Sequence, residues 1–412
     1  EEFLALAHDL TDIDEKVAAS GADIILFATS YLMRFYSGNS LPVVLDLAAN
    51  IELEAVFTPG SDFSDVIMGR LDQYARADFF IIGSPRQLPW YTPFWILAGL
   101  DIQQRHFTII PICCSPDLPP IPERDEPSFI CAGMFYPWQD PFDAQKELLS
   151  TLDAAKKGEF TIFTGKHPTW QDINTRLIDP RMRLGNSERL KVRGFFPFSE
   201  ITTEWAKYGC AIDVMKQNLE RALANPMRTT TYLWLGIPVI VSNFYWISEL
   251  IEHYDAGWLV DPLEKGAVRR ITESILRDPQ VLRPKALNAQ RLVRENLTWD
   301  KCVEGLDEFC KSPSKLERAN TLIAVVAEEM ARLSAEHIAI AKETGRIHGE
   351  VDFWRDKSRR LERELEEARV EMALKQRYIH DITNTRTWRA AHFIKRKILR
   401  IGNVKPTDQK EA

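Results

Sequence analysis

The residues best suited to chemistry stand in one short stretch, residues 225–231, which has the sequence Asn-Pro-Met-Arg-Thr-Thr-Thr. Its Asn and Pro predict a loop, and the residues from Thr229 onward predict the first turns of a helix. The backbone N–H groups of a first turn have no partners within the helix, and the positive end of the helix dipole lies beside them. Together with the cation of Arg228, this stretch is suited to bind an anion such as a phosphate.

Other candidate ligands follow predicted strands. Gly133, Lys166 and the segment from Gly194 to Phe198 each come directly after a continuous apolar run. In doubly wound sheets, ligands bind beyond the carboxyl ends of the strands, so we expect these loops to surround the anion site. Lys166 also fits a surface turn, and the ring of Phe198 fits a core position equally well.

Two of the charged candidates also fit structural roles that involve no ligand. Arg228 fits a solvated helix start that pairs with a carboxylate. Glu249, at the start of a second predicted helix, fits either a ligand contact or a helix cap.

The elements that must position these residues form two series of alternating strands and helices. Continuous apolar runs bounded by Gly, Pro or Asp are typical of strands buried on both faces of a parallel sheet. The expected strands are 23–29, 42–47, 78–83 and 107–112, then 129–133, 160–165, 190–194, 210–215 and 238–242. A proline-rich passage, 115–127, separates the two series and predicts a semi-rigid linker. Two α/β domains are therefore expected.

Composition limits the possible classes of protein. The chain has 412 residues, 45% hydrophobic and 27% charged, with a net charge of −7, so nothing invites nucleic acid as a partner. Six cysteines without CxxC spacing are expected to stay reduced. The sequence has no GxGxxG and no GxxxxGK[ST] motif, which argues against a dinucleotide-dependent dehydrogenase and against a P-loop enzyme. Because the chain starts Glu-Glu and its first half has only four strands, we expect a truncated N-terminal domain.

The second half resembles a known family. Asp213-Val214, Gly236-Ile-Pro-Val-Ile240, Glu249-Leu250 and Gly257-Trp-Leu-Val-Asp-Pro262 follow, in order, the pattern of large retaining nucleotide-sugar glycosyltransferases of the GT-B fold. The resemblance covers about residues 127 to 310 well and the first 118 loosely. It implies two Rossmann-like domains, with the acceptor on the N-terminal side and a nucleoside-diphosphate sugar on the C-terminal side. It also implies hexosyl or deoxyhexosyl transfer with retention.

The resemblance implies a donor pocket in the loops already named. No cofactor beyond the sugar donor is expected, and no metal, because no DxD-like carboxylate pair ends a suitable strand. No catalytic residue is assigned. The expected donor-binding residues are Gly133, Lys166, Gly194, Phe198, Asn225, Pro226, Met227, Arg228, Thr229, Thr231 and Glu249.

The sequence also departs from the family pattern. Thr231 and Leu223 stand where the family has two Glu residues, and Met134 stands in a loop where it has diphosphate-binding Arg and Lys residues. A hydroxyl lacks the charge-assisted hydrogen bonds of a carboxylate. Arg228, in an Asn-Pro-x-Arg variation of the loop, is expected to replace the missing cations. A catalytically degenerate scaffold that organises a polysaccharide assembly complex is the alternative function.

After the α/β region the pattern changes to a long helix. Apolar residues recur at alternating steps of three and four from Ile340 to Ile382, which is the heptad repeat of a coiled coil. We expect self-association or docking to a partner helix, with a single solvated helix as the alternative. The expected division is 1–118, a linker at 119–127, 128–311, a coiled coil at 315–383 and a tail at 384–412.

The tail is basic and amphipathic. Between residues 384 and 405 it has seven Lys or Arg, no acid and interleaved large apolar residues. Such a segment suits an anionic membrane surface. The stretch Thr385 to Arg389 resembles one that ends bacterial surface-polysaccharide glycosyltransferases, as in O-antigen assembly. We therefore expect a bacterial enzyme at the inner face of the cytoplasmic membrane that acts on a glycan or lipid-linked acceptor.

Overall fold

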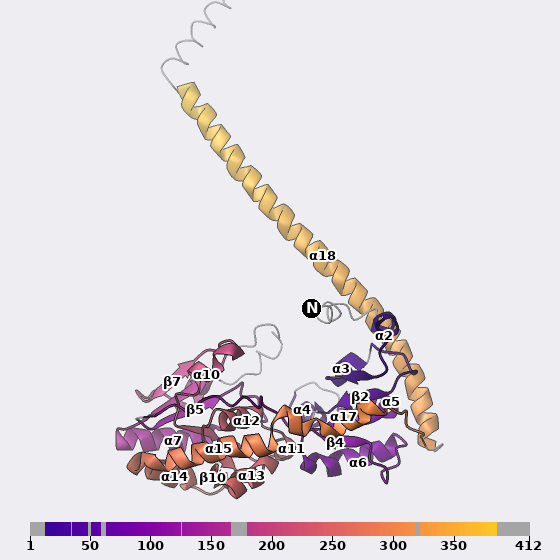
Figure 1. Ribbon diagram of the computed structural model, residues 1–412. Coiled ribbons are helices and arrows are strands. Elements are labelled where there is room, and N and C mark those ends of the chain that lie inside the picture. Colours follow the sequence, from indigo (N-terminus) through magenta and orange to yellow (C-terminus); the bar gives the residue numbers. More distant parts are fainter. Residues whose placement is uncertain are drawn as a thin grey trace, which may run out of the picture. The chain divides into compact units, whose positions relative to one another are not determined.

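The structure is a computed structural model that describes residues 13–33, 35–47, 51–58, 63–124, 126–165, 179–318 and 322–384 (Figure 1). The chain divides into two compact units, Glu1–Ile338 and Ala339–Ala412, which are treated separately below. Lys166 and residues 385–412, the greater part of the expected basic tail, lie outside the described residues.

The first half of unit 1 contains a parallel sheet of four strands in the order β1-β2-β3-β4. The strands are β1 (Ile25–Phe27), β2 (Val43–Asp46), β3 (Phe79–Ile82) and β4 (Phe107–Ile109). All four lie within the predicted apolar runs, and β3 is buried along its whole length. The prediction of a parallel sheet is therefore confirmed for this half, although β1 and β4 at its edges are only partly buried.

Helices cover both faces of this first sheet. α2 (Ile13–Ser20) precedes β1. The helices between the strands are α3 (Ser30–Met33), α4 (Ile51–Val56), α5 (Phe63–Arg76), η2 (Pro85–Gln87) and α6 (Leu88–Leu97). On one face, Tyr74 of α5 packs edge-on against Phe80, with ring centroids 5.9 Å apart. The opposite face is covered by α17 (Glu304–Lys311), where Phe309 stacks on Phe79 at 4.3 Å. The chain thus returns to its first sheet after completing the second.

The second sheet has six parallel strands in the order β10-β9-β8-β5-β6-β7. They are β5 (Ser128–Ala132), β6 (Glu159–Phe163), β7 (Leu190–Arg193), β8 (Cys210–Asp213), β9 (Val239–Ser242) and β10 (Gly257–Val260). The chain builds outward from β5 to β7, returns to the middle at β8 and builds outward the other way. The reversal of strand order between β5 and β8 is the topological switch point of a doubly wound sheet.

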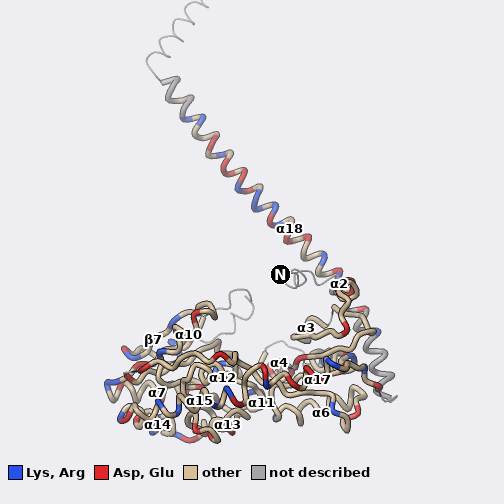
Figure 2. Tube along the Cα trace, viewed as in Figure 1, with Lys and Arg blue, Asp and Glu red and all other residues tan. Residues whose placement is uncertain are grey.

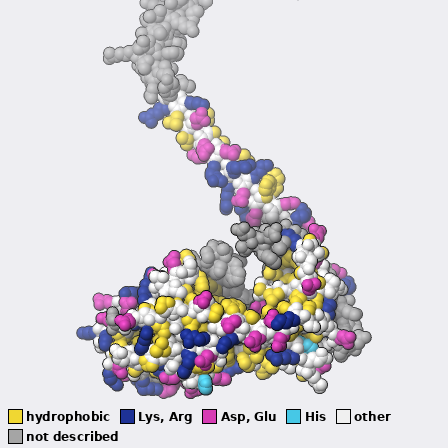
Figure 3. Space-filling model, viewed as in Figure 1, with side chains coloured by type: hydrophobic (Ala, Val, Ile, Leu, Met, Phe, Trp, Pro, Cys, Tyr) yellow, Lys and Arg dark blue, Asp and Glu magenta, His cyan; other side chains and the backbone are white. Residues whose placement is uncertain are grey.

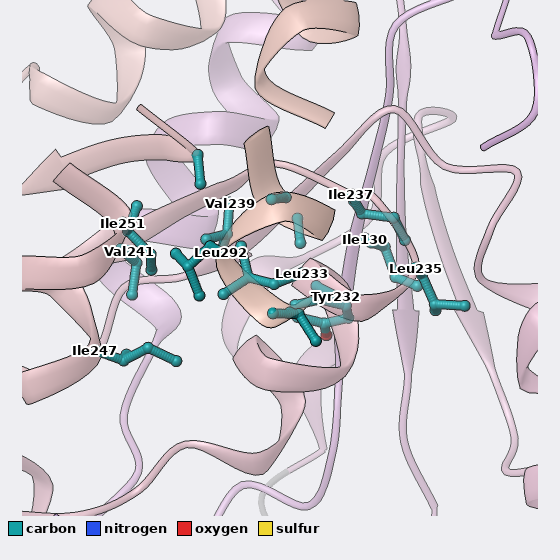
Figure 4. Close-up of a cluster of buried hydrophobic side chains, with 14 of the residues drawn as sticks. Ile130, Tyr232, Leu233, Leu235, Ile237, Val239, Val241, Ile247, Ile251 and Leu292 are labelled. Carbon is teal, nitrogen blue, oxygen red and sulfur yellow. The ribbon is translucent and has the colours of Figure 1, made fainter. Parts of the chain in front are cut away.

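Two helical layers enclose the second sheet. The helices α7 (Phe142–Ala155) and α14 (Ala267–Arg277) contact each other, as do α12 (Met227–Trp234) and α13 (Trp246–Tyr254) with α15 (Leu282–Asn296). Figure 4 shows part of the α12–α15 core, where Leu233 of α12 lies among Val239 of β9 and Leu292 of α15. Shorter elements are α9 (Pro180–Leu184), η3 (Phe198–Glu200), α10 (Ile201–Glu204), α11 (Leu219–Leu223), η4 (Pro279–Val281) and α16 (Trp299–Cys302).

One strand of this sheet is absent from the strands expected from the sequence. It is the edge strand β10, which begins at Gly257. A Cβ at Gly257 would lie 2.2 Å from the carbonyl oxygen of Val239, so only glycine allows β10 to approach β9 this closely. The missed strand is only four residues long and half-buried along most of its length, which weakens its apolar signal.

The proline-rich passage is irregular and packs on the second sheet's layers. Arg124 donates to the carbonyl oxygen of Gly236 at 2.9 Å, and Gln290 donates to that of Pro119 at 2.7 Å. Trp234 donates to the carbonyl oxygen of Ser115 at 3.0 Å. Trp234 and Gln290 therefore satisfy backbone carbonyl groups of a segment that cannot form a strand or a helix of its own, and Arg124 of that segment bonds the second half in return.

The last described element is α18 (Leu322–Asn384), a continuous helix of 63 residues. The predicted long helix is confirmed, but a coiled coil needs a second helix, so the coiled coil stays a prediction. Within the described ranges, no helix has the length and apolarity needed to cross a membrane.

Candidate functional site

The carboxyl ends of β5 and β8 meet at the switch point of the second sheet, and Arg228 of α12 lies between them. Gly133 follows β5 with φ +128°, and a Cβ on it would lie 3.0 Å from the Cζ of Arg228. Asp213 ends β8, and its Oδ1 lies 3.9 Å from the Nε of Arg228. A guanidinium thus occupies the place where doubly wound sheets bind ligands.

Arg228 is held by three kinds of contact. Its Nη2 donates to the Oε1 of Gln139 at 2.7 Å, and its guanidinium lies 5.8 Å from the ring centre of Phe135. Burial is the largest single effect and lowers the pKa of Arg228, but Asp213 and, after it, Cys131 and two tyrosines together outweigh burial and raise the pKa overall. Nη1 is buried without a hydrogen-bond partner among the described residues. The side chain is therefore a fixed cation with one donor group unused.

The three threonines after Arg228 have different roles. Thr229 donates to the Oδ2 of Asp213 at 2.5 Å, which ties the start of α12 to the end of β8. Thr230 is fully buried, and its hydroxyl has no partner in the described part of the chain. Thr231 donates back to the carbonyl oxygen of Met227 at 3.0 Å. Its hydroxyl proton is therefore occupied within the helix, and only its lone pairs stay available to a ligand.

The first turn of α12 has no side-chain cap. Pro226 is the N-cap residue and offers no side-chain acceptor, so the N–H groups of Met227, Arg228 and Thr229 keep their donor capacity. Asn225 donates from Nδ2 to the carbonyl oxygen of Gly83 at 3.1 Å, while its own Oδ1 is buried without a partner in the described residues. The helix start therefore lies against the loop that follows β3 of the first sheet.

Solved structures share this architecture. Sucrose-phosphate synthase from Thermosynechococcus elongatus is similar with a TM-score of 0.55 and 16% sequence identity, over 73% of this chain and 76% of that chain. HepE of Anabaena, solved with UDP and glucose, is similar with a TM-score of 0.52 and 18% identity, over 72% of this chain and 80% of that one. The chain has the GT-B fold. TarM also matches, with a TM-score of 0.51 and 11% identity, over 70% of this chain but only 54% of TarM. No family model matches the sequence, and no curated protein matches it by sequence.

In this GT-B chain, an aromatic group lies beyond β6 and β7. The ring of Phe195 lies over Gly165, where a Cβ would meet it at 3.4 Å, and Phe195 is 45% exposed. Phe198 is 72% exposed, whereas Phe196 packs edge-on against Phe163 at 5.3 Å. A Cβ added at Gly194 would have nothing within 4 Å of it. Two of the three Phe rings in the predicted segment are thus accessible at this edge, and the third belongs to the core.

Glu249 contacts the first sheet's layers. Its Oε1 accepts a hydrogen bond from Arg86 of η2 at 2.6 Å, and its side chain is 73% exposed. Gln87, next to Arg86, donates to the carbonyl oxygen of Leu223 at 3.0 Å. Glu249 is therefore engaged in an ion pair between the two α/β halves of unit 1. A contact between Glu249 and the nucleotide-sugar donor stays a prediction.

Two residues at the site were not among the predicted ligands. Asp213 and Gln139 hold Arg228, although neither was expected to contribute. The sequence places Asp213 at the end of a strand. It does not show that this strand, β8, pairs with β5 and so brings Asp213 beside the loop that follows β5. Among the described residues, no group of three His, Cys, Asp or Glu side chains is placed to hold a metal ion.

A groove of about 960 Å³ lies elsewhere in the second half of unit 1, between α7 and α14. Its wall includes Lys216 and Asp261, which follow β8 and β10, but neither Arg228 nor Asn225. The groove is therefore a neighbour of the candidate site rather than part of it.

Proposed function

We propose that this protein is a glycosyltransferase that moves a sugar from a nucleoside-diphosphate sugar to a cell-surface glycan or a lipid-linked acceptor. The observation that carries the proposal is the cation of Arg228 beside the uncapped start of α12, at the switch point of a GT-B fold. HepE, which is similar in fold, was solved with UDP and with UDP-glucose. The sugar is a hexose or deoxyhexose, and its transfer proceeds with retention.

The diphosphate lies against the first turn of α12. Free N–H groups at a helix start, the positive end of the helix dipole and Arg228 together favour an anion. The Nη1 of Arg228 is buried without a hydrogen-bond partner among the described residues and lies against Gly133, which has no side chain, so this donor is the one assigned to a phosphate oxygen. Asp213 offsets part of the charge of Arg228, so Arg228 and the N–H groups of α12 act chiefly through directed hydrogen bonds.

The nucleoside extends along the sheet edge toward Phe195 and Phe198. The strands β5, β6 and β7 are neighbours, and adjacent strands lie about 4.8 Å apart, so the end of β7 lies roughly 10 Å from Gly133. A nucleoside diphosphate spans that distance. An exposed Phe ring then covers the face of the base.

In the transfer itself, negative charge develops on the leaving diphosphate as the sugar–oxygen bond breaks. Arg228 and the N–H groups of α12 are fixed before the reaction, so they stabilise this charge without reorganising. Asn225 touches both α/β layers at this point, through Gly83. The acceptor hydroxyl approaches from the first sheet's side and takes the sugar.

Calorimetry with UDP, GDP, dTDP and CMP tests the proposal. One of these nucleotides binds the intact chain, and Arg228→Ala weakens that binding at least tenfold, because charge-assisted hydrogen bonds to phosphate are lost. Arg277→Ala, on the exposed end of α14, is the matched control and leaves binding unchanged. A melting temperature for each variant separates lost binding from lost folding.

The alternative function is a scaffold without transfer activity. It is favoured by Thr231 and Leu223 at the two positions where the resembled family has Glu, and by the hydroxyl of Thr231 bonding back to Met227. If no nucleotide binds the folded chain, the scaffold replaces the enzyme.

The basic tail supports attachment to an anionic membrane at the inner face of the cytoplasmic membrane. Near such a surface each Lys or Arg contributes about 1 kcal/mol, so the seven cations between residues 384 and 405 make attachment reversible but appreciable. Flotation with anionic liposomes tests this, because deleting residues 385–412 abolishes it. Unchanged flotation of the shortened chain removes the membrane from the proposal.

A further inference from the structure

Unit 2 presents an apolar stripe on α18 that no described residue covers. Seven seam residues are between 45% and 63% exposed. They are Ile340, Ile347, Val351, Trp354, Leu361, Leu365 and Met372. Figure 3 shows hydrophobic side chains between charged ones along this helix. A stripe of this kind on a long helix is typically buried against another helix.

The heptad positions of the stripe follow from its spacing. Steps of three and four place Val351, Leu365 and Met372 at position a, and Trp354 and Leu361 at position d. The residues next to this seam, at positions e and g, decide which helix can pair and in which direction. In a parallel two-stranded coil, each g residue faces the e residue five positions later on the other helix.

The charges at these positions match a second copy of the same helix. Three g–e pairs have opposite charges, and none has like charges. The pairs are Glu350 with Arg355, Lys357 with Glu362, and Glu364 with Arg369. The flanking pairs are Glu343 with His348 and Glu371 with Gln376. Figure 2 shows the alternation of acidic and basic residues along α18. We infer that α18 forms a parallel, in-register, two-stranded coiled coil with a second copy of this chain.

The opposite orientation is disfavoured by the same residues. Antiparallel helices place g beside g and e beside e, and four of the five charged g residues are Glu. That arrangement sets Glu against Glu along most of one flank. The seam also includes Lys375, which two strands leave partly in water, whereas a third strand would enclose its ammonium group.

The charged side chains are free to re-pair in the dimer. In the single helix, Arg355 bonds Asp352 at 2.6 Å, and Arg369 lies 3.7 Å from Glu366, in pairs whose side chains are 58% to 69% exposed. Exposed pairs within one helix contribute little to stability, so exchanging them for pairs between helices costs little.

Charge reversal on the full chain tests the pairing. Light scattering on the intact chain gives twice the 47.4 kDa of one copy. Glu350→Arg with Glu364→Arg, or Arg355→Glu with Arg369→Glu, raises the dissociation constant about 100-fold, since each opposite pair becomes a like pair. Mixing the two variants restores the dimer. Glu366→Arg with Glu367→Arg makes the same change in net charge at positions b and c and leaves the dimer intact.

Disulfide formation tests the direction. Thr344 is at position a and Lys375 is at position d, and the two lie equally far from the layer of Ser358 and Leu361. Antiparallel helices place a opposite d, so they would bring Thr344 of one helix to Lys375 of the other. In a Cys310→Ser background, parallel helices cross-link Thr344→Cys to itself and Lys375→Cys to itself. Cross-linking only when the two variants are mixed indicates antiparallel helices and overturns the inference. The inference is also overturned if the chain stays monomeric, or if the charge reversals at positions g and e leave the dissociation constant of the dimer unchanged.

Discussion

Two of the buried arginine–carboxylate pairs of unit 1, chosen one from each α/β half, have different geometries. In the first half, the Nε of Arg70 lies 2.7 Å from the Oε1 of Glu52, with side chains only 4% and 1% exposed. Tyr74 donates to the same oxygen at 2.8 Å. In the second half, Arg228 and Asp213 are 3.9 Å apart, and the arginine side chain is 14% exposed.

The difference separates a structural pair from one that keeps capacity for a ligand. A close, enclosed pair with an added hydroxyl compensates the desolvation of its two charges. A pair that is nearly 4 Å apart and has a neighbouring glycine leaves its arginine able to bind an anion. Position in the fold agrees, since only the second pair lies at a switch point.

Breaking the first pair has the largest expected effect. Arg70→Ala leaves Glu52 buried without its cation, which costs about 3–5 kcal/mol of unfolding free energy. Urea denaturation measures the loss, and the double variant Arg70→Met with Glu52→Leu recovers most of it. Nucleotide binding of the folded fraction stays unchanged. If Arg70→Ala lowers the free energy of unfolding no more than a surface substitution does, the pair does not stabilise the fold.

Adding a methyl group at Gly133 tests whether the second pair binds a nucleotide. Gly133→Ala is strained at φ +128° and brings Cβ within 3.0 Å of Arg228, so both stability and nucleotide affinity fall. Gly185→Ala is the control, because its φ of +76° is also strained but nothing lies within 4 Å. Both variants lose about 1 kcal/mol of stability from the backbone. Only Gly133→Ala also loses several-fold in nucleotide affinity by calorimetry.

A titrating residue beside the first pair gives a pH test. Burial, followed by the negative charge of Glu220 on α11, raises the pKa of Glu54 from 4.5 to about 7. Between these values the folded chain keeps a proton that the unfolded chain has released, so stability falls as pH rises through this window. Glu54→Gln does not titrate there.

The variant therefore matches the natural chain near pH 4.5 and is more stable by about 2 kcal/mol above pH 7. Urea midpoints across this range measure the difference. Glu273→Gln, on the exposed surface of α14, is the control and shows no such trend. A constant difference at all pH values contradicts the titration of Glu54 in this window.

The sequence predicted much of this architecture because buried parallel strands have a local signal. Runs such as Phe79–Ile82 and amphipathic helices such as Ala267–Arg277 need no knowledge of their neighbours. The half-buried edge strand at Gly257 lacked that signal and was missed. The long helix from Leu322 was predicted because its heptads repeat within one segment.

The site was predicted only in part, since its contacts join residues far apart in the chain. Arg228 was found from its own loop, but its partners Gln139 and Asp213 come from the ends of two other strands. The ion pair of Glu249 with Arg86 joins residues 163 positions apart. Strand order, which no local pattern records, decides which of these ends meet.

Neutralising Asp213 has the smallest expected effect and tests the comparison most directly. Asp213→Asn keeps an oxygen for the hydroxyl of Thr229 but removes the charge that offsets Arg228. The diphosphate then meets less repulsion, so nucleotide affinity rises about three- to tenfold, or ~1 kcal/mol. Without ligand the same variant melts lower, because a buried guanidinium has lost its counter-charge. Saturating nucleotide restores the melting temperature, since the diphosphate supplies that charge. Glu52→Gln loses stability too, but nucleotide does not restore it. Restoration of both variants, or of neither, contradicts the division into a structural pair and a ligand-binding pair.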